Sequence, residues 1–204
     1  MKLVVLGATG GTGLEIIRQT IKRGHSVTAF VRSPERLTMS AFDDHLDIIK
    51  GDLLNQLEIE RVIEGRDAVL SAFGTRTGEP RVQGRFATAL RKAMMQTGVR
   101  RVALMSTSFL FQDSIAPFIV GRLFFRKVMT DASEMEGVIS ESGLDWTIVR
   151  PVRLTDAPYT GRYRVQEGHL PTLGFTISRA DVADFMIKAV ENRFSTRKIV
   201  GVCN

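Results

Sequence analysis

Short apolar runs alternate with amphipathic stretches along the chain. The runs predict strands at residues 3–6, 26–32, 46–50, 67–72, 99–105, 145–150 and 198–202. Between them, apolar residues recur at helical spacing and predict helices, among them residues 82–97 and 131–142. A last helix is expected from Ser178, with Asp181 placed to complete a capping box. Strand and helix in alternation predict an α/β fold, a doubly wound and mostly parallel sheet with helices on both faces.

The stretch between residues 151 and 178 departs from this alternation. It is rich in glycine and proline around two short stretches, 159–165 and 175–177, that we interpret as strands. We expect this small excursion to shape a substrate pocket. The rest of residues 1–204 is expected to belong to the same single domain.

Three evenly spaced glycines, Gly7, Gly10 and Gly13, follow the first predicted strand, and a helical pattern begins directly after them. In a strand, turn and helix unit this spacing permits a tight turn, a close approach of the backbone to a pyrophosphate, and close packing of the helix on its strand. The N–H groups at the start of that helix would face the phosphates. A purely structural turn is the alternative, but the position of the glycines favours a Rossmann-type dinucleotide-binding domain.

Two arginines mark the second predicted strand. In a Rossmann unit the adenosine ribose reaches the end of this strand, where an acidic residue would accept from the 2′-hydroxyl of NAD. This chain has Arg32 there, and Arg36 follows one turn along a helix that Ser33 can cap and Pro34 can open. Two guanidinium groups can converge on a 2′-phosphate, so NADP is the expected cofactor. Two solvated arginines are the alternative.

Composition narrows the class of protein. The 204 residues, 44% of them hydrophobic, suffice for one globular core. The single cysteine, Cys203, leaves no intrachain disulfide or thiolate cluster, so we expect a reducing, cytoplasmic setting. No signal peptide is recognisable, and no apolar run approaches the roughly 20 residues that span a bilayer. We therefore expect no membrane partner.

The net charge of +6 suits a polyanionic ligand. Nucleic-acid binding would require basic residues clustered in one footprint, whereas here they are scattered along the chain. We expect no nucleic-acid partner, and a polyanionic small molecule accounts for the excess as well.

Other candidate residues follow the predicted strands, at the sheet edge where open α/β sheets bind ligands. Asp52 can meet the adenine amino group, or it can cap the next helix. The loop at residues 73–77, with Arg76, is a candidate for the middle of the cofactor. Ser106, Thr107 and Ser108 can orient a substrate or relay a proton, or they can simply cap a turn.

The segment at residues 115–128 mixes phenylalanines with arginines and lysine. We interpret it first as an amphipathic helix with its apolar side in the core. The functional alternative is a flat apolar lid or a dimer face beside the cleft. A monomer or a weak homodimer is expected.

The residues that are missing limit the chemistry. Ketone reduction by short-chain enzymes uses a tyrosine with a lysine four residues later, but Tyr159 is followed at that spacing by Tyr163, and Tyr163 by Glu167. The histidines show no metal-ligand spacing, and His25 is expected to be exposed. Either the hydride acceptor needs no strong protein acid, or the dinucleotide is bound without catalysis.

Seven strings resemble one protein family. They are GATGGTG at 7–13, VRSPERL at 31–37, GDLL at 51–54, GTR at 74–76, STSFL at 106–110, ESGLDWTIVRP at 141–151 and ISRADVADFM at 177–186. Together they are similar to the atypical short-chain dehydrogenase/reductases. Within these, the GTR and STSFL strings and PYTG at 158–161 favour the branch of the flavin reductases (NADPH), or biliverdin-IXβ reductases. Sugar epimerases and NmrA-like sensor proteins share the general signature.

This resemblance implies NADPH as the hydride donor and a flavin (FMN or FAD) or linear tetrapyrrole as the flat acceptor. Carried over by position, the cofactor residues are Gly7, Thr9, Gly10, Gly11, Thr12 and Gly13 for the pyrophosphate, Arg32 and Arg36 for the 2′-phosphate, Asp52 and Leu53 for the adenine, Gly74, Thr75 and Arg76 for the middle, and Pro151 and Val152 for the nicotinamide. Thr107 stands where the family has a serine, with Ser108 and Ser106 beside it, and these three are the candidate catalytic hydroxyls. Phe109 and Arg153 are the candidate substrate contacts, and Arg153 replaces a histidine of the animal enzymes.

Three hypotheses result. The first is an NADPH-dependent reductase of a planar small molecule, such as a flavin, linear tetrapyrrole or quinone, without a tyrosine and lysine pair. The second is a non-catalytic, NADP-binding redox sensor of NmrA-like type that docks through residues 115–128. The third and weaker one is a sugar epimerase or dehydratase, against which the missing pair argues.

Overall fold

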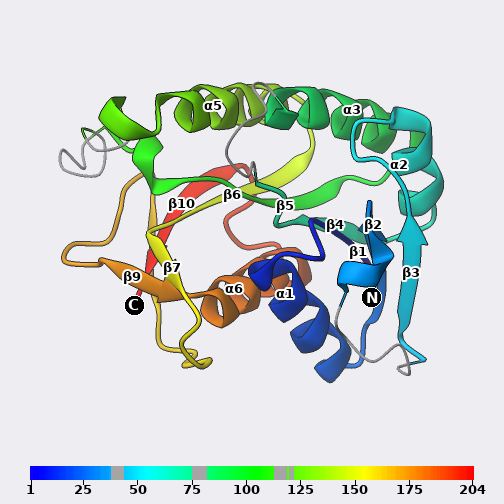
Figure 1. The fold of residues 1–204 in the computed structure, drawn as a ribbon, viewed down its shortest axis with the longest axis horizontal. Helices are drawn as coiled ribbons and strands as arrows, with labels where there is room; N and C mark the ends of the chain where they lie inside the picture. Colours follow the sequence, from blue (N-terminus) through cyan, green and yellow to red (C-terminus); the bar gives the residue numbers. More distant parts are fainter. Residues whose placement is uncertain (38–43, 75–81, 113–118, 120–121) are drawn as a thin grey trace.

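The computed structural model describes residues 1–37, 44–74, 82–112, 119 and 122–204. In these residues an eight-stranded sheet lies between two layers of helices (Figure 1). Its strands, in sheet order, are β3 (Leu46–Lys50), β2 (Ser26–Val31), β1 (Lys2–Leu6), β4 (Ala68–Ser71), β5 (Arg101–Met105), β6 (Asp145–Pro151), β10 (Lys198–Cys203) and β8 (Arg164–Glu167). Neighbours run parallel except β8, which pairs antiparallel with β10. The predicted fold class is confirmed.

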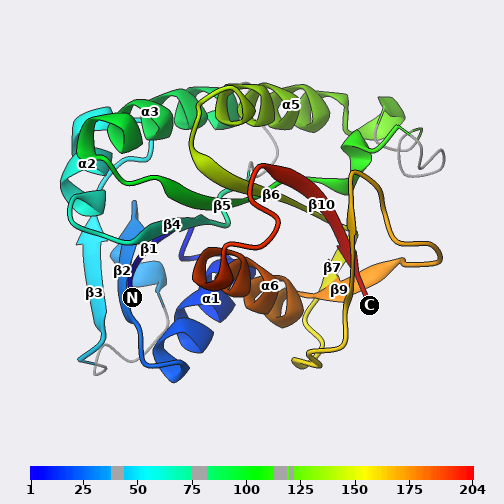
Figure 2. The same cartoon turned by 180° about the vertical axis from the view of Figure 1, so that it is seen from behind.

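The helices are divided between the two faces of the sheet (Figures 1 and 2). One face carries α1 (Gly11–Lys22) and α6 (Arg179–Asn192), and the other carries α2 (Gln56–Ile63), α3 (Val82–Thr97) and α5 (Arg126–Ser140). The bounds of α3 are those that the sequence predicts. Connections over alternate faces are the doubly wound arrangement of a Rossmann-type domain.

The central strands are buried on both sides. In β1, Leu3 and Val5 join the core beneath α1 and α6, while Val4 and Leu6 join the core beneath α2, α3 and α5. All four side chains are 0% exposed. Because helices cover both faces, a parallel strand has no polar face, so it is visible in the sequence as a continuous apolar run.

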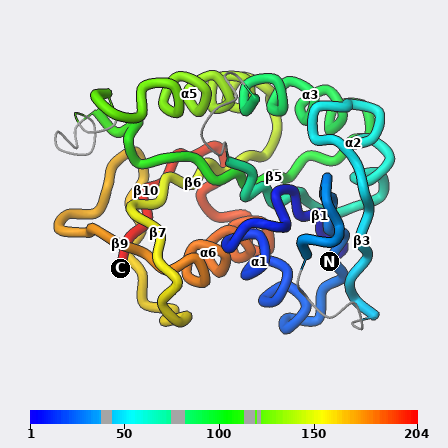
Figure 3. The backbone as a smooth tube through the Cα atoms, viewed as in Figure 1, coloured from blue at the N-terminus to red at the C-terminus, as the bar shows by residue number. Residues whose placement is uncertain are grey.

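The excursion between β6 and α6 differs from the prediction (Figure 3). No strand forms over most of 159–165, and β8 begins only at Arg164. Instead β7 (Arg153–Thr155), which the sequence did not predict, pairs with β9 (Thr176–Ser178) in a separate small sheet. Instead of a strand partner, Thr160, Gly161 and Tyr163 have hydrogen bonds to carboxylates of α6, and local sequence patterns do not reveal such contacts.

Helix α5 begins at Arg126, earlier than the predicted start at Asp131. The Asp131 carboxylate is buried and does not begin its own helix. It accepts hydrogen bonds from the backbone N–H groups of Gln83 and Gly84, at 3.0 and 3.1 Å from Oδ1. Asp131 therefore caps the first turn of α3, to which its charge is also favourable.

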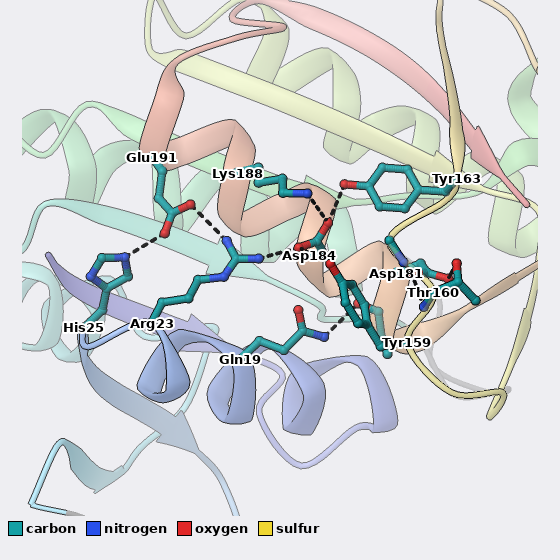
Figure 4. A network of polar contacts seen from close by, with 12 residues as sticks. Gln19, Arg23, His25, Tyr159, Thr160, Tyr163, Asp181, Asp184, Lys188 and Glu191 are labelled. Atoms are coloured by element: carbon teal, nitrogen blue, oxygen red, sulfur yellow. Dashed lines mark hydrogen bonds and ion pairs between the residues drawn. The ribbon is translucent and has the colours of Figure 1, made fainter.

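A buried carboxylate joins α1, α6 and the excursion (Figure 4). Asp184 in α6 is 1% exposed and accepts from the hydroxyl of Tyr163 at 2.6 Å. It pairs with Lys188 at 2.8 Å and, at a very short distance, with Arg23 at the end of α1. The Tyr159 hydroxyl lies 3.4 Å from its Oδ1. Buried charge is tolerated here because it is paired and hydrogen-bonded.

His25 belongs to the same network, so the expectation that it is simply exposed was wrong. Its Nε2 lies 2.7 Å from Glu191, which also pairs with Arg23 at 2.9 Å. The imidazole ring is therefore partly buried between the amino terminus and α6.

Asp181 fixes the middle of the excursion. The predicted Ser178 cap is present: its Oγ accepts from the N–H of Asp181 at 2.9 Å, and the Ser178 hydroxyl donates to the Asp181 carboxylate at 2.8 Å. The Asp181 carboxylate in turn accepts from the N–H groups of Thr160 and Gly161, at 3.0 and 2.8 Å. Burial favours the protonated form, but these hydrogen bonds outweigh it and hold the pKa of Asp181 below its ordinary value.

The stabilisation by Asp181 is therefore expected to depend on pH. A carboxyl whose pKa is lower in the folded state stabilises fully above its unfolded pKa, about 4, and loses this effect as pH falls through the folded pKa. In urea unfolding, Asp181→Asn should lower the free energy of unfolding at pH 7, and its difference from wild type should shrink below pH 4. A difference that is constant between pH 3 and pH 7 would contradict this account.

Candidate functional site

A cavity of about 390 Å³ opens at the carboxyl ends of β1 to β4. The strand order reverses between β1 and β4, which is where open α/β sheets bind their ligands. The cavity is lined by Gly7, Ala8, Thr9, Gly10, Phe30, Val31, Arg32, Ser33, Arg36, Asp52, Leu53, Leu54, Ala72, Phe73, Gly74 and Val82.

The three spaced glycines make three different contributions at this turn. Gly7 has φ of +73°, and a Cβ on it would lie 2.6 Å from the backbone N of Phe73. A Cβ on Gly13 would press on the carbonyl oxygen of Gly7 and lie 2.8 Å from Ala8 Cα. At Gly10 the nearest such atom is 3.4 Å away, so this position is open. The first and third glycines serve the turn and the packing, and the second leaves space for a ligand.

The amino end of α1 is available to an anion. Gly10 is its N-cap residue and has no side chain to cap the first turn, which consists of Gly11, Thr12 and Gly13. That turn also has no acidic residue. The N–H groups of a first turn lack partners within their helix and carry partial positive charge. Gly10 itself lines the cavity, and this first turn follows it directly along the chain.

Arg32 and Arg36 lie at the cavity wall and are exposed. Arg36 ends a single 3₁₀ turn, η1 (Pro34–Arg36), rather than a longer helix, and the Ser33 side chain makes no cap bond. Pro34, at the first position of this turn, already has the φ angle that the turn requires, so the turn forms without a hydrogen-bonded cap. Within the described residues, neither guanidinium has a hydrogen bond or an ion pair.

Asp52 and Leu53 line the cavity beside these arginines. Asp52 Oδ1 accepts from the N–H of Leu54 at 2.9 Å, so the side chain closes a local turn. It does not cap α2, as the alternative interpretation had it. Asn55 does, accepting from the N–H of Leu57 at 3.1 Å. Gly74 also lines the cavity, whereas Thr75 and Arg76 lie outside the described residues.

Three hydroxyls follow β5, outside this cavity. Thr107 is the N-cap of η2 (Ser108–Leu110), and its Oγ1 accepts from the N–H of Phe109 at 3.3 Å. Its proton can therefore still be donated, and the residue is partly exposed. Ser108 is 7% exposed. Ser106 Oγ is buried and has no partner among the described residues. Ser106 and Thr107 are both partly exposed residues, but the Ser106 oxygen itself is buried, so Thr107 is the best placed of the three to donate a proton to a ligand.

A buried ion pair supports the turn that carries these hydroxyls. Arg150 in β6 donates to Glu136 in α5 from Nε at 2.9 Å and from Nη2 at 2.5 Å. The same guanidinium lies 4.6 Å from the centre of the Phe111 ring, just after η2. Sequence reasoning missed this pair because its members are mid-element residues without a motif.

Of the predicted nicotinamide residues, Pro151 is the last residue of β6 and Val152 follows it directly. Pro151 and Val152 are buried, and the Val152 N–H donates to the carbonyl of Val202 at 3.3 Å. Arg153 in β7 is exposed, and in the described part of the chain its guanidinium has no partner. These residues do not line the cavity around the glycine turn. The structure brings the adenosine-side candidates together and leaves the acceptor-side candidates along the same sheet edge.

The aromatic segment is more exposed than expected. Phe109 stacks on Phe125, with ring centroids 5.1 Å apart and planes 8° from parallel. Leu123 and Phe124 are 70% and 75% exposed, so the core interpretation was wrong for this part of 115–128. Residues 115–118, 120 and 121 lie outside the described residues.

Among the described residues, no group of three or more His, Cys, Asp or Glu side chains is placed to hold a metal ion. No helix in the same residues is long and apolar enough to cross a membrane. The cytoplasmic location stays a prediction.

The glycine turn, the sheet order and the cavity define a Rossmann-type dinucleotide-binding protein. The chain belongs to the NAD(P)H-binding family, whose model matches residues 7–193.

The chain is also similar to two relatives in sequence and to two solved structures in fold. It is 31% identical to an uncharacterised chloroplastic protein of Arabidopsis thaliana, over 98% of this chain and 76% of that one. A (4-alkanoyl-5-oxo-2,5-dihydrofuran-3-yl)methyl phosphate reductase of Streptomyces griseus is 30% identical over 73% of this chain but 46% of its own length. The structure of the oxidoreductase ylbE from Lactococcus lactis has a TM-score of 0.84 at 22% identity, covering 100% of this chain and 91% of that one. A short-chain dehydrogenase/reductase from Veillonella parvula in complex with NADP has a TM-score of 0.78 at 18% identity, covering 100% and 94%.

Proposed function

We propose that this protein is an NADPH-dependent reductase that passes hydride to a flat acceptor such as a flavin (FMN or FAD), a linear tetrapyrrole or a quinone. One observation carries the proposal: two guanidinium groups without partners in the described residues, Arg32 and Arg36, line the same cavity as the glycine turn. Arginine binds phosphate through charge-assisted, often bidentate hydrogen bonds. The reductase among the relatives supports the reaction class.

The residues present fit the dinucleotide. The space at Gly10 and the uncapped first turn of α1 suit a diphosphate, because N–H groups can approach it without a side chain between. Asp52, beside Leu53 at the wall, can accept from an adenine amino group. The two arginines would hold the 2′-phosphate, which is the group that distinguishes NADPH from NADH.

The chain contributes binding and orientation rather than a strong acid. When bound, NADPH supplies a hydride and leaves as NADP⁺, while the acceptor takes up that hydride and one proton from solvent. Thr107 would donate a hydrogen bond that orients the acceptor, and Phe109, stacked on Phe125, would offer it an apolar face. Arg153 would meet an acidic group of the acceptor.

The tyrosines argue against epimerase or dehydratase chemistry. Both hydroxyls lie within hydrogen-bonding distance of Asp184. Burial, followed by the hydrogen bond to Asp184, raises the pKa of Tyr163 well above its ordinary value, whereas a catalytic tyrosine needs a lowered one.

The second candidate is an NADP-binding sensor without catalysis. The exposed side chains of Leu123 and Phe124 favour it, because apolar groups on a surface suit a docking partner. An assay separates the two candidates: purified protein is given NADPH or NADH with FMN, FAD, biliverdin and a quinone in turn. Turnover with NADPH well above NADH supports the reductase. Cofactor binding without turnover of any acceptor would favour the sensor.

Substitution of Thr107 tests its proposed contact. Thr107→Val should lower kcat/KM for the acceptor about tenfold, the effect of one lost hydrogen bond of about 1.4 kcal/mol. Thr107→Ser keeps the hydroxyl and should stay close to wild type, while Ser108→Ala should have little effect because Ser108 is buried.

Thr107→Val also removes the cap of η2, so thermal unfolding and NADPH affinity are measured alongside. An unchanged kcat/KM in a destabilised Thr107→Val would show that the hydroxyl only caps the turn.

A further inference from the structure

The side chain of Arg179 crosses the first turn of α1. A Cβ placed on Gly11 would lie 2.6 Å from Arg179 Cδ and 2.9 Å from its Nε. The turn, the ligand space and the helix packing are provided by Gly7, Gly10 and Gly13, and none of these requires a fourth glycine at position 11. Gly11 therefore leaves room for an arginine that comes from the far end of the chain.

The backbone of Arg179 is fixed against α1. Arg179 is the first residue of α6, directly after the cap residue Ser178. Gln19 Nε2 in α1 donates to the carbonyl of Ala180 at 2.8 Å, which ties the start of α6 to α1. Arg179 therefore projects from a helix that is bonded to α1, rather than from a loop.

The charge of Arg179 is only partly matched. Nη1 pairs with Asp156 Oδ1 at 2.6 Å, and the Asp156 side chain is 89% exposed. Solvent-exposed pairs of this kind contribute little and are easily exchanged. A guanidinium carries five N–H donors in a planar fork, so several remain for a second anion. The neighbouring first turn of α1 has no acidic residue and no side-chain cap.

We propose that Arg179 binds the diphosphate of the dinucleotide, with Asp156 holding the guanidinium over Gly11. This rests on the proposed NADPH binding and adds a contact to it. The diphosphate is the part of a dinucleotide that lies at the first turn of α1 in this fold. Arg32 and Arg36 follow β2 and serve the other end of the cofactor. The chain thus has separate cations for the 2′-phosphate and for the diphosphate.

Two ligands distinguish these cations. NADPH carries both phosphate groups, whereas adenosine 2′-monophosphate carries the 2′-phosphate and no diphosphate. Binding is measured by calorimetry on the purified full chain. Arg179→Gln should raise the Kd of NADPH about 10- to 100-fold, as expected for a hydrogen bond to a charged group, and leave the Kd of adenosine 2′-monophosphate within about twofold. Arg32→Ala should weaken both ligands.

Arg18→Gln is the matched control. Arg18 lies on α1, the helix that begins at Gly11; its side chain is 63% exposed and pairs with Glu15. The Arg18→Gln substitution removes the same charge at a position away from the Arg179 guanidinium, and it should change neither the Kd of NADPH nor that of adenosine 2′-monophosphate. Arg179→Lys, which keeps the charge but not the planar fork, should give an intermediate loss for NADPH.

A coupling experiment tests the contact itself. Gly11→Ala should displace the Arg179 side chain and weaken NADPH binding, and it should cost much less in an Arg179→Ala background. An NADPH Kd within twofold of wild type in Arg179→Gln, or an equal loss for both ligands, would overturn this proposal while leaving the proposed function intact. Wild-type protein that binds neither ligand would overturn both.

Discussion

Replacing both Arg32 and Arg36 by alanine is expected to weaken NADPH binding about 10²- to 10⁴-fold and to change NADH binding less than about threefold. Both guanidinium groups lie at the cavity wall, exposed, with no partner in the described residues. A hydrogen bond to a charged group contributes about 1.5–3 kcal/mol, and two such contacts to one phosphate give the range stated. Titration of each cofactor into the double variant measures the effect.

The control for this prediction is a pair of exposed arginines outside the cavity. Arg18→Ala with Arg61→Ala, on α1 and α2, removes the same net charge and should leave the preference for NADPH unchanged. Salt should weaken NADPH binding to wild type more than to the double variant, because ions screen an exposed phosphate site. An equal loss of NADPH and NADH affinity in the Arg32 and Arg36 double variant would show that these arginines do not bind the 2′-phosphate.

The largest loss of stability is expected from Asp184→Ala, at about 3–5 kcal/mol of the free energy of unfolding. The Asp184 side chain is 1% exposed. Its carboxylate pairs with Arg23 and Lys188 and accepts a hydrogen bond from the hydroxyl of Tyr163. Its removal leaves a partly buried guanidinium and a partly buried hydroxyl without this acceptor, and the desolvation of those groups is no longer offset. Urea unfolding followed by circular dichroism measures the loss.

Asp156→Ala is the comparison for stability, since Asp156 is 89% exposed and has one ion pair. Its effect should stay below about 1 kcal/mol. A loss below about 1 kcal/mol for Asp184→Ala as well would mean that the network in Figure 4 does not join the two helices energetically.

The strands and α3 were predictable because their signal is local. A parallel strand between two helical layers is apolar on both faces, so β1 and β4 are continuous apolar runs. Local chemistry likewise marked the start of α6, where the Ser178 side chain caps the N–H of Asp181. The predicted start of α5 at Asp131 was wrong because Asp131 caps α3, a helix distant in the sequence, instead of starting its own helix.

That the glycine turn and the two arginines would lie around one cavity was predictable for a similar reason. The spacing of Gly7, Gly10 and Gly13 is required by a single turn, and Arg32 and Arg36 follow the neighbouring strand. The hydroxyl that would contact an acceptor was less predictable, because Ser106, Thr107 and Ser108 are adjacent and chemically alike. Only burial separates Ser106 and Ser108 from Thr107, and burial depends on what packs over β5.

By itself, the sequence determined the alternation of strands and helices, the glycine turn and the arginines beside it, since each follows from residues close together in the chain. Only the tertiary structure decided which carboxylate caps α3, which groups Asp184 contacts, and which side chain lies over Gly11. Gln19 and Ala180, which meet where α1 packs on α6, are 161 positions apart. Contacts of this kind arise from packing two helices on one sheet, and the hydrophobic period that reveals each helix carries no information about what its polar ends will meet.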